Sequence, residues 1–194
     1  MLSRSLPRFI LLSFFIVWTT ARAAAVSIRL DAVGTAQEVA APGWGPKLQA
    51  GGGIAVVLSI PFTSWFDFAT SLEIFGVLPS DTTGGFSYRG FGGGALGVAA
   101  EARFLQAQSP TIGHLAFGVT AGGAAALPAY QYTALYFYYP EARLGLFLLW
   151  QPARMQNLAF RLQVPFRYQF RRDMTFSFST GLGIGVSYSI GVPP

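Results

Sequence analysis

The chain has 194 residues, a length that suits a single domain. Only 11% of the residues are charged and 52% are hydrophobic, whereas a soluble domain carries about 25% charged residues. The composition therefore excludes an ordinary water-facing surface, and the high aromatic content of 15% excludes intrinsic disorder. The absence of cysteine excludes a disulfide framework and a thiolate metal site. A protein in contact with lipid is favoured.

Residues 1–23 have the parts of a cleaved secretory signal peptide. Arg4 and Arg8 give a positive start, and Phe9–Trp18 form a short apolar core, so we expect cleavage before Ala24. The alternative is an uncleaved anchor, but this apolar run is too short to span about 30 Å of hydrocarbon. Removal of the three arginines of this segment lowers the formal charge from +5 to +2, so a nucleic-acid partner is not expected.

The rest of the chain, residues 24–194, alternates with a period of two between turn-like breaks. Only helices and closed β-barrels can cross a membrane with every backbone group paired, and this period is that of strands. In residues 158–170, for example, Leu, Phe, Val and Tyr occupy one face while Arg, Gln, Ala and Pro occupy the other. Eight strands are predicted, at residues 25–33, 47–60, 65–77, 91–104, 114–127, 140–150, 157–170 and 174–191.

Charged residues in the predicted strands are separated by even numbers of positions, which places each pair on one face of a strand. On a helix, a spacing of two would put them about 200° apart. The ten residues, five basic and five acidic, all lie opposite the large apolar side chains, which predicts a neutral, lumen-lining charge network. They are Arg29, Asp31, Asp67, Glu73, Glu101, Arg103, Glu141, Arg143, Arg161 and Arg167.

The pattern predicts an all-β, closed, antiparallel, eight-stranded transmembrane β-barrel, and two other architectures are the alternatives. A soluble barrel or sandwich would carry many Lys and Glu residues on its polar face, whereas this face is mostly Gly, Ala and Ser between the charges. A helical membrane protein would need long uninterrupted apolar runs, but glycine and proline interrupt residues 104–140 repeatedly. The pattern favours the membrane barrel.

The lengths of the connections predict the topology. Short turns at 61–64, 106–113 and 151–156 would face the periplasm, and longer loops at 34–46, 79–90 and 128–139, with a tight turn at 171–173, would face outward. Hairpin geometry then predicts cross-strand neighbours. These are Arg161 with Gly183, Gln163 with Gly181, Glu141 with Arg167, and Asp67 with Arg103.

Pro165 stands inside a predicted strand. Proline cannot donate to a ladder, and a closed barrel has no edge to accommodate it. We therefore expect a local bulge at this residue.

A signal peptide, eight alternating strands and an arginine–carboxylate lumen together resemble the small outer-membrane barrels of diderm bacteria. These are the OmpW-like, OmpX-like and opacity-type proteins and the membrane domain of OmpA, and the resemblance covers residues 24–194. It implies an outer-membrane location, a lipid-bilayer environment and assembly by the outer-membrane insertion machinery. Members of this group usually end on an aromatic residue, whereas this chain ends in Val192-Pro193-Pro194.

Sequence signals for catalysis or cofactors are weak. Residues 92–97 match G-x-G-x-x-G, but no helix is expected after them, so close strand packing is the better interpretation. His114 is the one histidine, and no second histidine or cysteine is available to complete a metal site with it. Carboxylates paired with arginine stay ionised and suit acid–base work poorly. No enzymatic activity, metal or cofactor is expected.

Two functions remain open from the sequence. The first is a narrow, porin-like channel for small and perhaps apolar solutes, which the many small lumen-facing residues favour slightly. The second is a non-conducting surface barrel that acts as an adhesin, an envelope-stabilising protein or an immune-evasion protein with a host ligand. Eight strands enclose a space that side chains nearly fill, which counts against a wide pore.

Overall fold

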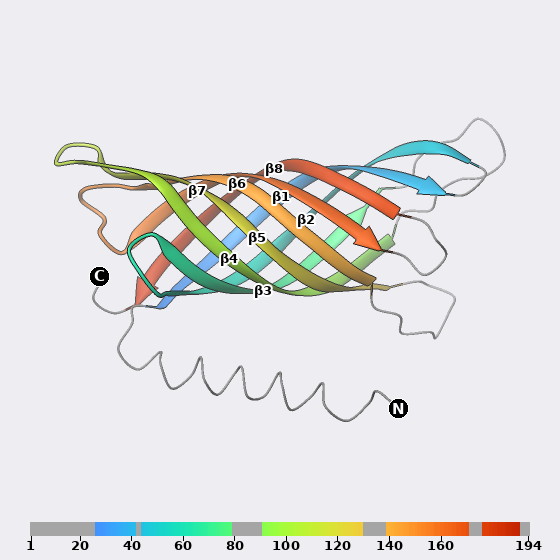
Figure 1. Ribbon diagram of the computed structural model, residues 1–194, viewed down its shortest axis with the longest axis horizontal. Coiled ribbons are helices and arrows are strands. Elements are labelled where there is room, and N and C mark those ends of the chain that lie inside the picture. Colours follow the sequence, from blue (N-terminus) through green and yellow to red (C-terminus); the bar gives the residue numbers. More distant parts are fainter. Residues whose placement is uncertain (1–25, 42–43, 79–90, 130–138, 171–175, 191–194) are drawn as a thin grey trace, which may run out of the picture.

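The computed structural model describes residues 26–41, 44–78, 91–129, 139–170 and 176–190. They form a closed antiparallel barrel in which each strand pairs with its neighbours in the sequence and β8 pairs with β1 (Figure 1). The strands are β1 Val26–Ala41, β2 Trp44–Pro61, β3 Phe66–Val77, β4 Phe91–Ser109, β5 Gly113–Ala129, β6 Tyr139–Gln151, β7 Leu158–Phe170 and β8 Phe176–Ile190. The predicted all-β, closed, eight-stranded fold is confirmed. The predicted signal peptide lies outside the described residues.

The residues that alternate along each strand of the sequence face alternately the lumen and the exterior of the barrel. Along β3, Asp67, Ala69 and Glu73 are buried in the barrel, whereas Leu72 and Ile74 are 56% and 73% exposed on its exterior. The same division holds around the barrel, so large aliphatic side chains form most of the outer surface and the ten charged residues predicted for the lumen lie within. No helix in the described part of the chain is long and apolar enough to cross a membrane.

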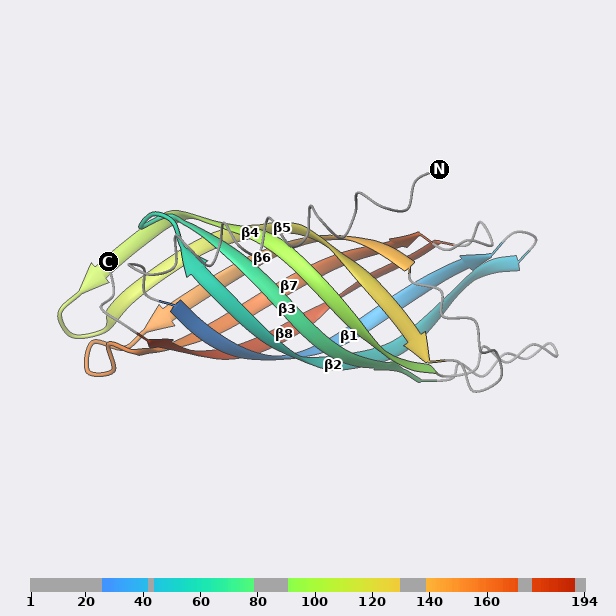
Figure 2. The same ribbon diagram turned by 90° about the horizontal axis from the view of Figure 1, so that it is seen from below.

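The barrel has two ends that differ in their connections. The turn end carries the short connections 62–65, 110–112 and 152–157, together with the first residue of β1 and the last of β8 (Figure 2). The opposite end, which we call the loop end, is where β1, β3, β5 and β7 end and β2, β4, β6 and β8 begin. The loops predicted at 79–90 and 171–173, and most of the loop predicted at 128–139, lie outside the described residues.

The predicted loop at 34–46 is wrong, because β1 and β2 continue as a hairpin from Gly34 to Ala41 and from Trp44 onward. Gln37 and Gln49 are opposite each other in this extension and are buried on the lumen face. The alternation thus continues, but through Gly, Ala, Thr and Gln residues that carry little hydropathy contrast.

A β-bulge at Phe104 changes the expected turn at 106–113. Arg103 is opposite Gly118 and Leu105 is opposite Phe117, so Phe104 is the extra residue. The strand continues to Ser109, and the turn is only 110–112. Because one residue is added, Phe104 and Leu105 are both exposed, at 61% and 69%. Before the bulge the odd-numbered Glu101 and Arg103 face the lumen, and after it the even-numbered Gln106 and Gln108 do.

The predicted register is wrong by two residues in three hairpins. Arg161 is opposite Gly185 and Gln163 is opposite Gly183. Glu141 is opposite Gln169, and Asp67 is opposite Glu101. A shift of two keeps every side chain on its predicted face, because strand side chains alternate with that period.

The predicted bulge at Pro165 is also wrong. The β7–β8 pairing passes from Gln163–Gly183 to Phe166–Thr180 with the register unchanged, and Val164 and Pro165 are skipped. On the other side, Pro165 is opposite Gly145 without a register shift. The proline interrupts one ladder locally, and no extra residue is inserted.

Candidate functional site

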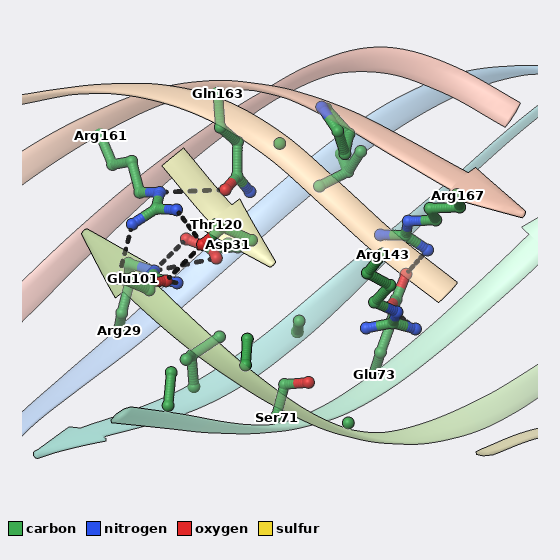
Figure 3. A pocket seen from close by; sticks show the side chains of 18 of the residues that line it. Arg29, Asp31, Ser71, Glu73, Glu101, Thr120, Arg143, Arg161, Gln163 and Arg167 are labelled. Carbon is green, nitrogen blue, oxygen red and sulfur yellow. Dashed lines mark hydrogen bonds and ion pairs between the residues drawn. The ribbon is translucent and has the colours of Figure 1, made fainter. Parts of the chain in front are cut away.

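All ten charged residues predicted for the lumen project into it, and all ten take part in ion pairs. Most of them separate into two groups along the barrel axis, which we call the turn-side layer and the loop-side layer (Figure 3). One further pair lies at the turn end. The turn-side layer consists of Arg29, Asp31, Glu101 and Arg161. The loop-side layer consists of Glu73, Glu141, Arg143 and Arg167. The pair is Arg103 with Asp67.

Glu101 is the centre of the turn-side layer. Its Oε1 accepts from Arg29 Nη2 at 2.9 Å, and its Oε2 accepts from Arg161 Nη1 at 2.9 Å. Arg29 also donates through Nε to both oxygens of Asp31, at 3.0 and 2.9 Å. All four residues are at most 7% exposed. Two cations and two anions from β1, β4 and β7 therefore cross the lumen as one neutral group.

Neutral side chains complete the coordination of Arg161. Its Nε donates to Gln163 Oε1 at 3.0 Å, and its guanidinium carbon lies 3.9 Å from the centre of the Phe147 ring. Thr120 Oγ1 lies 3.4 Å from Arg161 Nη2 and donates to Glu101 Oε1 at 3.3 Å. Buried ions need such additional contacts to offset desolvation. The layer thus joins β1, β4, β5, β6 and β7.

Glu73 is the centre of the loop-side layer and is 2% exposed. Its Oε1 accepts from Arg167 Nη1 at 2.5 Å, and its Oε2 lies 3.0 Å from Arg143 Nη2 as an ion pair without hydrogen-bond geometry. Arg143 Nε donates to Glu141 Oε1 at 2.5 Å. Gln169 Nε2 donates to Glu141 Oε2 at 2.8 Å. This layer is again neutral, with two cations and two anions.

Glycine provides the space that the layers occupy. A Cβ on Gly185 would lie 2.0 Å from Asp31 Oδ1, and one on Gly53 would lie 3.0 Å from Glu73 Oε1. These residues of β8 and β2 leave room for carboxylates that a larger side chain would displace. Charged side chains of neighbouring strands therefore occupy the space beside the small residues of the lumen face.

The remaining space is divided by the two layers. A vestibule of about 370 Å³ at the turn end is bounded by Arg29, Glu101 and Arg161. A chamber of about 90 Å³ lies between the layers and has an apolar wall of Val33, Ala55, Val57 and Ala69 (Figure 3). A space of only about 20 Å³ lies beyond Glu73 and Arg167 toward the loop end.

Two neutral residues of the site, Thr120 and Phe147, were not predicted from the sequence. Both lie on the lumen face of their strands, and this parity is the signal that identifies them. Gln169 lies on the face that the alternation of residues 158–170 predicts. His114 contacts Gln106, with 3.3 Å between Nε2 and Oε1. In the described part of the chain, no three His, Asp or Glu side chains are grouped as a metal site requires.

Comparison with known proteins shows the fold. No protein-family model and no curated relative matches the sequence. Among solved structures, the chain is similar to Neisserial surface protein A, with a TM-score of 0.58 and 14% identity over 86% of this chain and 99% of that one. It is also similar to the N-terminal β-barrel domain of Pseudomonas aeruginosa OprF, with a TM-score of 0.52 and 14% identity over 84% and 97%. The expected resemblance to small eight-stranded outer-membrane barrels is thus confirmed at the level of the fold.

Proposed function

We propose that residues 24–194 form an integral outer-membrane barrel after removal of the signal peptide at 1–23. The exterior supports this proposal, because residues such as Leu30, Leu72 and Ile184 are 56–63% exposed on it, and hydrocarbon is the solvent that suits them. In this topology the turn end faces the periplasm and the loop end faces outward. The lipid bilayer and the outer-membrane insertion machinery are the implied partners.

We further propose that the barrel is non-conducting in its resting state and serves the envelope or the cell surface. The observation that carries the proposal is the division of the lumen by two separately neutral ion layers. A solute would have to part buried charges from their partners, and removal of one partner of a buried pair costs about 3–5 kcal/mol. Each layer also carries no net charge that would attract ions of one sign into the lumen.

The second candidate is a narrow channel for small solutes, the function that the small lumen-facing residues of the sequence slightly favour. The vestibule and the apolar-walled chamber favour it, because they are spaces on either side of the turn-side layer. This function requires the charged side chains to move during passage. A surface interaction with a host ligand would depend on the outer loops, most of which lie outside the described residues.

Uptake into liposomes separates these candidates. We expect liposomes that contain the refolded residues 24–194 to take up arabinose and toluene no faster than liposomes that contain a barrel with the lipid-facing substitution Leu72→Ala, or than empty liposomes. Replacing all four residues of one layer by serine should leave the barrier closed, because the other layer still crosses the lumen. Replacing both layers should open it.

Two results would contradict the proposal. Uptake by the unmodified barrel would make it a channel. A folded barrel that lacks both layers and still excludes arabinose would show that the layers are not the barrier. Heat-modifiable migration on a gel reports folding of each variant in the same samples.

A further inference from the structure

The β4–β5 hairpin extends past its neighbours at the turn end. Pairing of β3 with β4 stops at Phe66 and Ala102, with one more bond from Arg103 N–H to the carbonyl of Trp65. The β4 strand continues to Ser109, paired with β5 on one side. Within the described residues, nothing pairs with the other side of Leu105–Ser109. This segment is therefore a free strand edge at the turn end of the closed barrel (Figure 2).

The free segment Leu105–Ser109 itself carries no charge and no proline, and no described strand pairs with its outer side. Proteins protect exposed edges with charges, prolines or a covering segment, because an open edge presents unpaired N–H and C=O groups to any extended chain. Residues 104–109 are Phe-Leu-Gln-Ala-Gln-Ser, without a charge or a proline. The bulge at Phe104 precedes the free segment and leaves the segment itself regular.

The free edge also borders the vestibule. Because the bulge reverses the alternation, Gln106 and Gln108 line the vestibule together with Ser64, while Leu105 and Ala107 are exposed on the other face. Gln106 Nε2 donates to the carbonyl of Ser64 at 3.2 Å, across the gap where a ninth strand segment would lie. A strand added at this edge would complete the wall of the vestibule.

We propose that the β4 edge binds an extended segment of another polypeptide by strand addition, opposite Leu105–Ser109. Backbone bonds would give the affinity, and alternate side chains the specificity. One face of the segment would be apolar, against Leu105 and Ala107. The other would be neutral and polar, because the arginines and carboxylates of the vestibule already form ion pairs with one another.

A second copy of the barrel does not fit this edge. Barrel strands tilt by about 35–45° from the axis. Two copies inserted in the same direction in one membrane are related by rotation about the membrane normal. Where the two barrels meet, their strands are tilted in opposite directions. The two strand edges therefore cross and cannot pair along their length. The partner is therefore a protein on the aqueous side of the turn end. The compartment assigned to this partner depends on the proposed membrane topology, whereas the free edge does not.

A tethered strand tests the proposal. The last described residue, Ile190, lies at the turn end, so a flexible linker of about 20 Gly and Ser residues after Pro194, with a reach of about 25 Å, can deliver Thr-Val-Ser-Val-Thr to the edge. The control carries Thr-Pro-Ser-Pro-Thr, which lacks two of the backbone donors. The readout is hydrogen–deuterium exchange of amides 105–109 in the refolded barrel.

We expect exchange in this segment to slow by roughly tenfold with the Val-containing tether and to be unchanged with the Pro-containing tether. Leu105→Lys should abolish most of the protection, whereas Ile112→Lys, which adds the same charge in the adjacent turn, should preserve it. Equal exchange with and without the tether, or equal protection by the two tethers, would overturn the proposal. So would loss of protection in both lysine variants.

This result is independent of the conductance of the lumen. Protease resistance of the liposome-inserted barrel, measured on the same samples, reports whether the proposed membrane topology has failed. If the barrel inserts and is closed but amides 105–109 show no protection from exchange, only the strand-addition proposal is contradicted.

Discussion

Glu101 satisfies two arginines at once, so its removal should be more damaging than the loss of a surface charge. Glu101→Gln leaves Arg29 and Arg161 buried with Asp31 as the one remaining carboxylate of the layer. We expect a loss of about 3–5 kcal/mol in the free energy of unfolding, since the uncompensated charge stays desolvated. Urea unfolding of the refolded barrel in lipid vesicles measures it.

Glu38 provides the matched control, because its side chain is exposed on the exterior face of β1. Glu38→Gln should change the free energy of unfolding by no more than about 0.5 kcal/mol. If the two variants unfold at the same urea concentration, the turn-side layer does not stabilise the barrel.

The location of the ten charges could be predicted from the sequence, but most of their partners could not. Parity alone assigns a residue to the lumen or the exterior, and parity is unaffected by a register error of two. Arg161 was expected near Gly183 and lies opposite Gly185. Its actual partner, Glu101, is on a strand that does not adjoin β7. Contacts across a lumen depend on closure of the whole barrel, which no local pattern encodes.

At the scale of the strand, closure depends on a close approach between β8 and β1. Gly181 is opposite Thr35, and a Cβ on it would lie 1.9 Å from the backbone oxygen of Gly34. Gly181→Ala should therefore cost about 1–3 kcal/mol through overpacking and slow the closing of the barrel. Folding rates from heat-modifiable gel shifts, together with urea unfolding, measure both effects.

Gly34→Ala tests the same β8–β1 pairing without a steric clash at the new Cβ. Its nearest neighbour would be the carbonyl oxygen of Leu182 at 4.0 Å, an ordinary contact. We expect a change within about 0.5 kcal/mol. Equal losses in the two variants would indicate that the close approach at Gly181 has no special role.

Strand boundaries were predictable where hydropathy alternates strongly and unpredictable where it does not. In β7, which runs from Leu158 to Phe170, the prediction differs from the structure by one residue. In the β1–β2 hairpin, mostly small or polar residues conceal eight residues of strand beyond Val33. At Phe104, two adjacent exposed apolar residues are the visible sign of a bulge, but adjacent apolar residues also occur at strand ends.

At the scale of the molecule, the cost of placing a charge on the exterior is expected to depend strongly on its depth in the bilayer. Leu72 lies near the middle of the barrel wall, where β2, β3 and β4 pair side by side. Leu72→Lys should cost about 2–4 kcal/mol in a bilayer, because the charge enters hydrocarbon. Phe62→Lys, in the exposed 62–65 turn, should cost about 0–1 kcal/mol. Unfolding titrations in vesicles give both values, and equal costs would argue against a membrane-spanning wall.

The most direct test of the closed lumen is the electrical conductance of the unmodified residues 24–194 in a planar lipid bilayer. Insertion is verified independently by protection from protease. We predict that inserted barrels give no steady conductance above the bare membrane in molar salt, because two neutral ion layers cross the lumen. A stable, repeated conductance step for each inserted barrel would contradict the account and establish an open channel.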